Sequence, residues 1–110
     1  MKVSVIIPSL NPDEKLVTVV DSLIRKGFGD IVLVNDGSDE SHMWPFEKVG
    51  AYKECTILTH DVNRGKGRAL KTAFEYCISN RKDYDGVVTV DGDNQHLSLI
   101  HISEPTRRVV

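Results

Sequence analysis

Four short apolar runs are spaced along the chain, and polar segments with helical periodicity separate them. The runs are residues 3–8, 31–34, 56–59 and 87–90, and none of them contains a charged residue. Continuous apolar runs of this length are typical of strands that are buried on both faces of a sheet. The pattern therefore predicts four such strands.

The segment after the first run has the signals of a helix start. Asn11 can cap a helix that has Pro12 at its first position, and the apolar periodicity then continues until Gly27. The segment 41–52 is ambiguous and indicates a short helix that begins near Pro45.

The segment before the last run is also periodic. Its helix is predicted to begin at Lys66, with apolar residues at i, i+3, i+4, i+7 and i+8 from Leu70 onward. Strands and helices in this order predict an α/β fold, with a Rossmann-like parallel sheet and helices on both faces. Such sheets bind ligands beyond the carboxyl ends of their strands, so the polar segments after the runs are the places to look for chemistry.

Composition narrows the class of protein. The 40% apolar and 27% charged residues are ordinary for a soluble domain, and the net charge of −2 argues against binding nucleic acid through bulk charge. No apolar run approaches the ~20 residues of a membrane span. Cys55 and Cys77 lack metal-ligand spacing, so we expect reduced thiols and a cytoplasmic protein.

Asp91 and Asp93 follow the last buried run, two residues apart. Carboxylates in this position can share a hard cation such as Mg²⁺ or Mn²⁺, which in turn can clamp a diphosphate. A bare D-x-D is more often a solvated acidic turn, but here it belongs to the longer and more specific string 91–96, DGDNQH.

Two further polar segments have a functional and a plain structural interpretation. Asp36 in the string 35–38, NDGS, can accept a hydrogen bond from a base N–H, although Asp-Gly-Ser is also common turn chemistry. The string 63–68, NRGKGR, combines glycines and bases at a helix start, which favours an anion. It is neither a P-loop nor a dinucleotide fingerprint, and a capping loop with solvated bases is the alternative.

Together these strings resemble the family-2 glycosyltransferases of the GT-A fold. Residues 5–11 resemble the opening strand and Pro-x-x-Asn turn of that family, and residues 34–38 its Asp-Asp-Gly-Ser segment. Residues 63–67 resemble its Asn-x-Gly-Lys-Gly loop, and residues 91–96 the DXD motif of the polyprenyl-phosphate sugar transferase branch. The resemblance implies an inverting enzyme that takes a UDP- or GDP-linked sugar as donor.

The resemblance also implies roles for residues of the donor site. Pro8 and Asn11 would line the nucleoside pocket, Asp36 would bind the base, and Lys66 would lie near the phosphates. Asp91 would contact the diphosphate.

The metal site is implied in the same way. Asp91 and Asp93 would hold Mn²⁺ or Mg²⁺, with Gln95 as a further ligand. Asn35 departs from the family by replacing the first Asp of its pair, and Leu10 stands where an aromatic often stacks.

The resemblance further implies that the catalytic base and the acceptor site lie downstream of the D-x-D. We therefore expect residues 1–96 to be the nucleotide-sugar-binding half of a glycosyltransferase domain and to be inactive alone. The acceptor, such as a polyprenyl phosphate or a glycan, is not identified. A nucleotidyltransferase and a non-catalytic nucleotide-binding fragment remain as alternatives.

The last residues interrupt the pattern. Residues 97–107, LSLIHISEPTR, resemble the translation of a transposase-type sequencing adapter. We therefore expect residues 97–110 to be a non-native tail with no designed place on the sheet, and we assign no function to His101 or Glu104.

Overall fold

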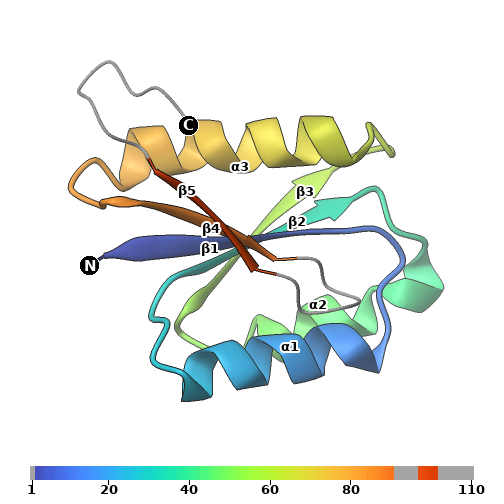
Figure 1. Cartoon of the computed structure of the whole chain (residues 1–110). Coiled ribbons are helices and arrows are strands. Elements are labelled where there is room, and N and C mark those ends of the chain that lie inside the picture. The colour runs from blue at the N-terminus through green and yellow to red at the C-terminus, as the bar shows by residue number, and fades with distance from the viewer. Residues whose placement is uncertain (1, 91–96, 102–110) are drawn as a thin grey trace.

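The computed structural model describes residues 2–90 and 97–101, which form one five-stranded sheet in the order β3-β2-β1-β4-β5 (Figure 1). The first four strands are parallel to one another, and β5 pairs antiparallel to β4. The four predicted apolar runs are all strands. The bounds are β1 Val3–Ser9, β2 Ile31–Asp36, β3 Cys55–His60, β4 Gly86–Val90 and β5 Leu97–His101.

Helices cover both faces of the sheet, which confirms the predicted α/β class. Helices α1 (Glu14–Arg25) and α2 (Trp44–Val49) lie on one face, and α3 (Lys66–Asn80) lies on the other (Figure 1). A short 3-10 helix, η1 (Glu40–His42), precedes α2. None of the helices in the described part of the chain has the length and apolar character needed to span a membrane.

The central strands are apolar on both sides because each side packs on a helix layer. Val5 and Ile7 of β1 join the core beneath α1 and α2, whereas Ile6 joins the core beneath α3. Strand β2 alternates in the same way and is buried along its whole length. This explains why β1 and β2 read as continuous apolar runs rather than alternating ones.

The start of α1 differs from the prediction. The helix begins at Glu14, and Asp13 is its cap, because the Asp13 side chain accepts a hydrogen bond from the backbone N–H of Lys15. Asn11, the predicted cap, instead has a positive φ of 49°. Its side chain instead accepts a hydrogen bond from the backbone N–H of Asp39, in the loop after β2.

An ion pair fastens α3 to the amino-terminal edge of the sheet. Asp30, buried just before β2, accepts hydrogen bonds from Arg81 Nε at 3.0 Å and Arg81 Nη2 at 3.1 Å. The hydroxyl of Ser4 in β1 donates to the same carboxylate. Because a bidentate guanidinium and a hydroxyl satisfy Asp30 together, the carboxylate can be buried at this edge.

Strand β5 departs from the expectation for the tail. Residues 97–101 pair with β4 in a continuous antiparallel register, from Val90 beside Leu97 to Gly86 beside His101. The open edge of β4 presents backbone N–H and C=O groups, and an extended segment of almost any sequence can satisfy them. The tail thus has a place at the edge of the sheet. Whether it is native stays a prediction.

Candidate nucleotide-binding site

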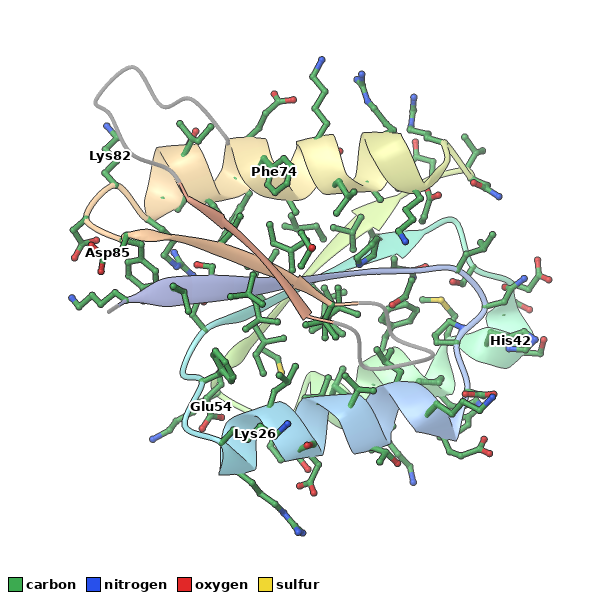
Figure 2. All side chains as sticks on the ribbon, in the orientation of Figure 1. Lys26, His42, Glu54, Phe74, Lys82 and Asp85 are labelled. Carbon is green, nitrogen blue, oxygen red and sulfur yellow. The ribbon has the colours of Figure 1, made fainter. Side chains whose placement is uncertain are left out.

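The carboxyl ends of β1 and β2 and the start of α3 line an open cavity of about 370 Å³. Figure 2 shows His42 on this side of the molecule, and Lys26, Glu54 and Asp85 at the opposite edge of the sheet. A second cavity, of about 340 Å³, lies at that opposite edge and includes Lys26, Phe28 and Tyr84 in its lining. The first cavity is lined by Pro8, Ser9, Leu10, Asp36, Asn63, Gly65, Lys66 and Ala69.

Asp36, the last residue of β2, is the buried charge of the first cavity. Its Oδ1 accepts hydrogen bonds from the backbone N–H of Arg64 at 2.8 Å and from Nδ1 of His60 at 2.8 Å. Its Oδ2 accepts from the backbone N–H of Gly65 at 2.9 Å. The carboxylate therefore holds the loop between β3 and α3 against the end of β2.

These hydrogen bonds decide the ionisation state of Asp36. Burial by itself would raise its pKa, but hydrogen bonds from the N–H of Arg64, the ring of His60 and the N–H of Gly65 leave the pKa lowered. Asp36 is therefore ionised at neutral pH. Its contribution to stability is present above its ordinary pKa and is lost as the pH falls through the lowered value.

Gly37 allows the two loops of the site to touch. It has a φ of +74°, and a Cβ at this position would overlap backbone atoms of Val62 and Asn63. Both the left-handed backbone and the close approach require glycine. The contact keeps the loop after β2 directly against the loop that Asp36 holds.

The loops after β1 and β2 are also joined through Asn11. Its Oδ1 accepts from the backbone N–H of Asp39 at 2.8 Å, and its own N–H donates to Oγ of Ser38 at 2.9 Å. Asn11 is not among the described residues that line the cavity. In the structure Asn11 therefore joins the loops after β1 and β2.

Asn35 has a structural environment that explains its departure from the family's Asp-Asp pair. It is buried, its Oδ1 accepts from the N–H of Ser38 at 3.0 Å, and its Nδ2 donates to Sδ of Met43 at 3.2 Å. A carboxylate here would keep the hydrogen bond from Ser38 but would place its second oxygen against a thioether, which has no proton to donate. The neutral amide suits this position better.

Ser9 is a site residue that the sequence reasoning missed. It lines the cavity, and its Oγ is buried without a hydrogen-bond partner among the residues that the structure describes. A buried hydroxyl is normally paired, so an unpaired one beside a cavity points to a ligand or water as its partner. The sequence signal is slight, because a serine in a Pro-Ser-Leu-Asn turn is ordinary loop chemistry.

The start of α3 brings cations and free backbone donors to the cavity. Gly65 precedes the helix with a φ of 94° and has no side chain to cap it, and the first turn contains no acidic residue. Arg64, Lys66 and Arg68 are exposed around this end. A helix N-terminus with neighbouring cations favours an anion.

The predicted site residues have different outcomes. Pro8, Asp36 and Lys66 line one cavity, and their roles in binding a nucleotide stay predictions. Asp91, Asp93 and Gln95 lie outside the described residues, so the predicted metal site stays a prediction. Within the described ranges, no group of three or more His, Cys, Asp or Glu side chains could hold a metal.

Both cysteines are free thiols, in agreement with the sequence. Burial, with help from Glu54 and Asp30, raises the pKa of Cys55 to about 11. Burial also raises the pKa of Cys77. Thiols of this kind are unreactive at neutral pH.

Comparison with known proteins identifies the family. The model of Glycosyl transferase family 2 matches residues 4–99, which is most of the chain, and the chain belongs to this family. The match favours a sugar transferase over a nucleotidyltransferase, the alternative left open by the sequence.

Two curated relatives are similar to the chain. An uncharacterized protein of Methanocaldococcus jannaschii is 27% identical over 95 residues, which cover 86% of this chain and 37% of the relative. The undecaprenyl-phosphate 4-deoxy-4-formamido-L-arabinose transferase of Proteus mirabilis is 28% identical over 102 residues, or 86% of this chain and 30% of the relative. The chain thus spans about a third of the length of these relatives.

Solved structures confirm the GT-A type of fold. Residues 1–349 of TarS of S. aureus, in complex with UDP-GlcNAc, have a TM-score of 0.68 and 23% identity, covering 96% of this chain and 29% of that TarS chain. Glucosyl-3-phosphoglycerate synthase of Mycobacterium tuberculosis, in complex with Mn²⁺, UDP and phosphoglyceric acid, has a TM-score of 0.58 and 20% identity. It covers 83% of this chain and 32% of the synthase.

The contact at Gly37 generates the first prediction. Gly37→Ala should destabilise the chain by about 2 kcal/mol or more, because the Cβ strains the positive φ and pushes the two loops apart. The matched control is Gly67→Ala, since Gly67 is in the first turn of α3 and nothing lies within 4 Å of an added Cβ. The control should be neutral or stabilising by up to about 1 kcal/mol. Chemical denaturation measures both, and equal effects would contradict the account of this contact.

Proposed function

We propose that this chain is the donor-binding half of an inverting glycosyltransferase that uses a nucleoside-diphosphate sugar and a divalent metal. One observation carries the proposal: in a family-2 chain, a cavity at the carboxyl ends of β1 and β2 joins an ionised Asp36 to the cationic N-terminus of α3. Asp36 can accept a hydrogen bond from an N–H of the base, and the start of α3 can bind the diphosphate. The two sides of the cavity thus match the two ends of a nucleoside diphosphate.

The nucleoside lies, in this proposal, between the turn after β1 and Asp36. A carboxylate has about four acceptor positions, and donors of the chain occupy three of those on Asp36. The remaining position, on Oδ2, accepts a base N–H. Ser9 offers its unpaired hydroxyl to the same ligand, and Pro8 and the exposed Leu10 supply apolar surface.

The diphosphate lies toward the start of α3, where Lys66 and the helix N-terminus offset its charge. Asp91 and Asp93, with Gln95, are the oxygen ligands we propose for Mn²⁺ or Mg²⁺. Asp91 follows directly on Val90, the last residue of β4, and β4 is the neighbour of β1 in the sheet. A bound metal of this kind stabilises negative charge on a departing diphosphate.

The proposed reaction is a single displacement with inversion. An oxygen of the acceptor forms a bond to the anomeric carbon while the bond from that carbon to the diphosphate breaks, and the acceptor proton passes to a general base. Lys66 stabilises the leaving diphosphate electrostatically. We propose that the base and the acceptor site belong to sequence downstream of Asp93, as the family resemblance implies, and that this chain alone binds the donor without transferring sugar.

The comparisons support one class of donor and one class of acceptor. TarS is in complex with UDP-GlcNAc, and the Proteus mirabilis relative is named for undecaprenyl phosphate. We propose a UDP- or GDP-linked sugar as donor, and a polyprenyl phosphate or a glycan as acceptor. The free thiols Cys55 and Cys77 suit the reducing cytoplasm, where nucleotide sugars would be bound.

We also propose that residues 97–110 do not belong to the natural domain. The support is the resemblance of residues 97–107 to a translated adapter and the end of the family match at residue 99. Sequencing the source gene beyond the codon for His96 tests this directly. We expect the gene to encode a different amino-acid sequence after His96. A gene that encodes the same LSLIHISEPTR string would contradict the proposal.

Metal-dependent nucleotide binding is the main prediction of the proposed function. Calorimetry should show that UDP or GDP binds, and that Mn²⁺ or Mg²⁺ strengthens the binding, because two carboxylates and Gln95 fill only part of an octahedral shell and phosphate oxygens complete it. Asp91→Asn combined with Asp93→Asn should abolish the strengthening by metal.

The control for this experiment is Asp39→Asn combined with Glu40→Gln. It neutralises two exposed carboxylates that follow β2 and do not line the cavity. The control should keep the metal effect. Nucleotide affinity that ignores both the metal and the Asp91 and Asp93 substitutions, in a chain with an intact far-UV spectrum, would refute the donor-site proposal. Sugar transfer by the chain would refute its inactivity.

The acceptor position of Asp36 generates a prediction about bases. Uracil and guanine carry a ring N–H that can donate a hydrogen bond to a carboxylate. The matching ring nitrogen of cytosine has no hydrogen and is itself an acceptor. CDP should therefore bind at least about tenfold more weakly than whichever of UDP and GDP binds better, since a lost charge-assisted hydrogen bond costs about 1.5–3 kcal/mol. Asp36→Ala should weaken binding of the preferred nucleotide by at least this factor, because it also frees the loop before α3, and should leave the metal dependence intact. Equal affinities for all three nucleotides would exclude this role.

A further inference from the structure

His60 connects the buried Asp36 to helix α3. It is the last residue of β3 and the register partner of Asp36 on β2. Its Nδ1 lies 2.8 Å from Oδ1 of Asp36, and its Nε2 lies 2.9 Å from Oγ1 of Thr72. The side chains of His60 and Asp36 are only 10% and 5% exposed. Both nitrogens of the imidazole are therefore engaged in a largely buried chain of hydrogen bonds.

The direction of the two hydrogen bonds, from His60 to Asp36 and between His60 and Thr72, follows from the chemistry of the groups at either end. An ionised carboxylate only accepts hydrogen bonds, so Nδ1 of His60 carries the proton that is donated to Asp36. In the neutral imidazole Nε2 is then an acceptor, and the hydroxyl of Thr72 donates to it. The carboxylate of Asp36 thus fixes the Nδ1–H tautomer, and the hydroxyl of Thr72, which can donate or accept, adapts to it.

The hydrogen bonds also close a ring through the backbone. Asp36 accepts from the N–H groups of Arg64 and Gly65, this loop leads directly into α3, and Thr72 on α3 returns to His60. The ring joins the end of β2, the end of β3, the loop and the helix. Within this ring, His60 contacts both Asp36 at the end of β2 and Thr72 on α3.

We propose that His60 is the positioning residue of the nucleotide site, an inference that rests on the proposed function. His60 is not among the described residues that line the cavity, so it acts through Asp36. By donating to Oδ1, it orients the carboxylate so that Oδ2 faces Gly65 and the cavity. By accepting from Thr72, it sets the distance between Asp36 and the start of α3, and so between the base end and the phosphate end of the site.

Two amide substitutions separate the hydrogen bond that His60 makes to Asp36 from the one that it makes with Thr72. His60→Asn places an amide N–H near the position of Nδ1 and loses the reach to Thr72. His60→Gln reaches the position of Nε2 and lacks a donor beside Oδ1 of Asp36. The two variants remove the same ring and differ in which hydrogen bond they can replace, so each is the matched control of the other.

The expected result is a difference in nucleotide affinity that stability does not explain. With UDP or GDP and Mg²⁺ as probes, His60→Gln should weaken binding about tenfold or more, and His60→Asn should remain within about threefold of the parent. Both variants should remain folded at the temperature of the binding assay, with denaturation midpoints well above it. Thr72→Val, which replaces the hydroxyl by a methyl group, should weaken binding only a few fold. Equal affinities for the two amide variants, or losses that follow stability alone, would overturn the proposal.

A spectroscopic signature tests the arrangement without any substitution. Nitrogen NMR should show that the neutral imidazole of His60 is the Nδ1–H tautomer, and its Nδ1 resonance should shift when the nucleotide binds. An Nε2–H tautomer would overturn the proposal. If the parent chain binds no nucleoside diphosphate, the proposed function fails and this inference fails with it. If the parent binds and His60→Gln binds equally well, only this inference fails.

Discussion

The carboxylate of Asp36 is the interaction on which the geometry of the site depends. Burial of a charge at the end of β2 is costly, and three donors within the chain offset that cost. Two of these donors are backbone N–H groups of the loop that starts α3. The need to satisfy one buried charge therefore fixes a loop that would otherwise be free to move away from the sheet. Gly37 makes this possible, because a side chain at that position would hold the two loops apart.

The fold explains why this charge lies beside a cavity. Parallel strands end at the same edge, and the connections after β1, β2 and β3 all leave from it. The opposite edge has its own buried carboxylate, Asp30, but there Arg81 and Ser4 satisfy it and join α3 to the sheet. One end of α3 is thus tied to the sheet by an ion pair, and the other end helps to form the site.

Much of the fold could be predicted from the sequence, and less of the site. The four apolar runs and the periodicity of α3 predicted the sheet and its class, because burial on two faces leaves a plain pattern. Asp36 and Lys66, which the motifs single out, both line the cavity, and their binding roles stay predictions. The partners of Asp36 could not be predicted, since the pairing of Asp36 with His60 depends on the register of β2 and β3, which the sequence does not state. Asn11 was misassigned as a helix cap because its use by the backbone of Asp39, 28 residues away, has no local signal.

The central claim is that a nucleoside diphosphate binds in the cavity between the turn after β1, Asp36 and the start of α3. Amide NMR during titration with UDP or GDP and Mg²⁺ tests it most directly, because it reports position as well as affinity. The amide resonances of Ser9, Gly65 and Lys66 should shift in a saturable manner, and those of Gly27, Phe28 and Tyr84 around the cavity at the opposite edge should not. Shifts confined to the opposite edge, or no shifts at millimolar nucleotide in the folded chain, would contradict the account.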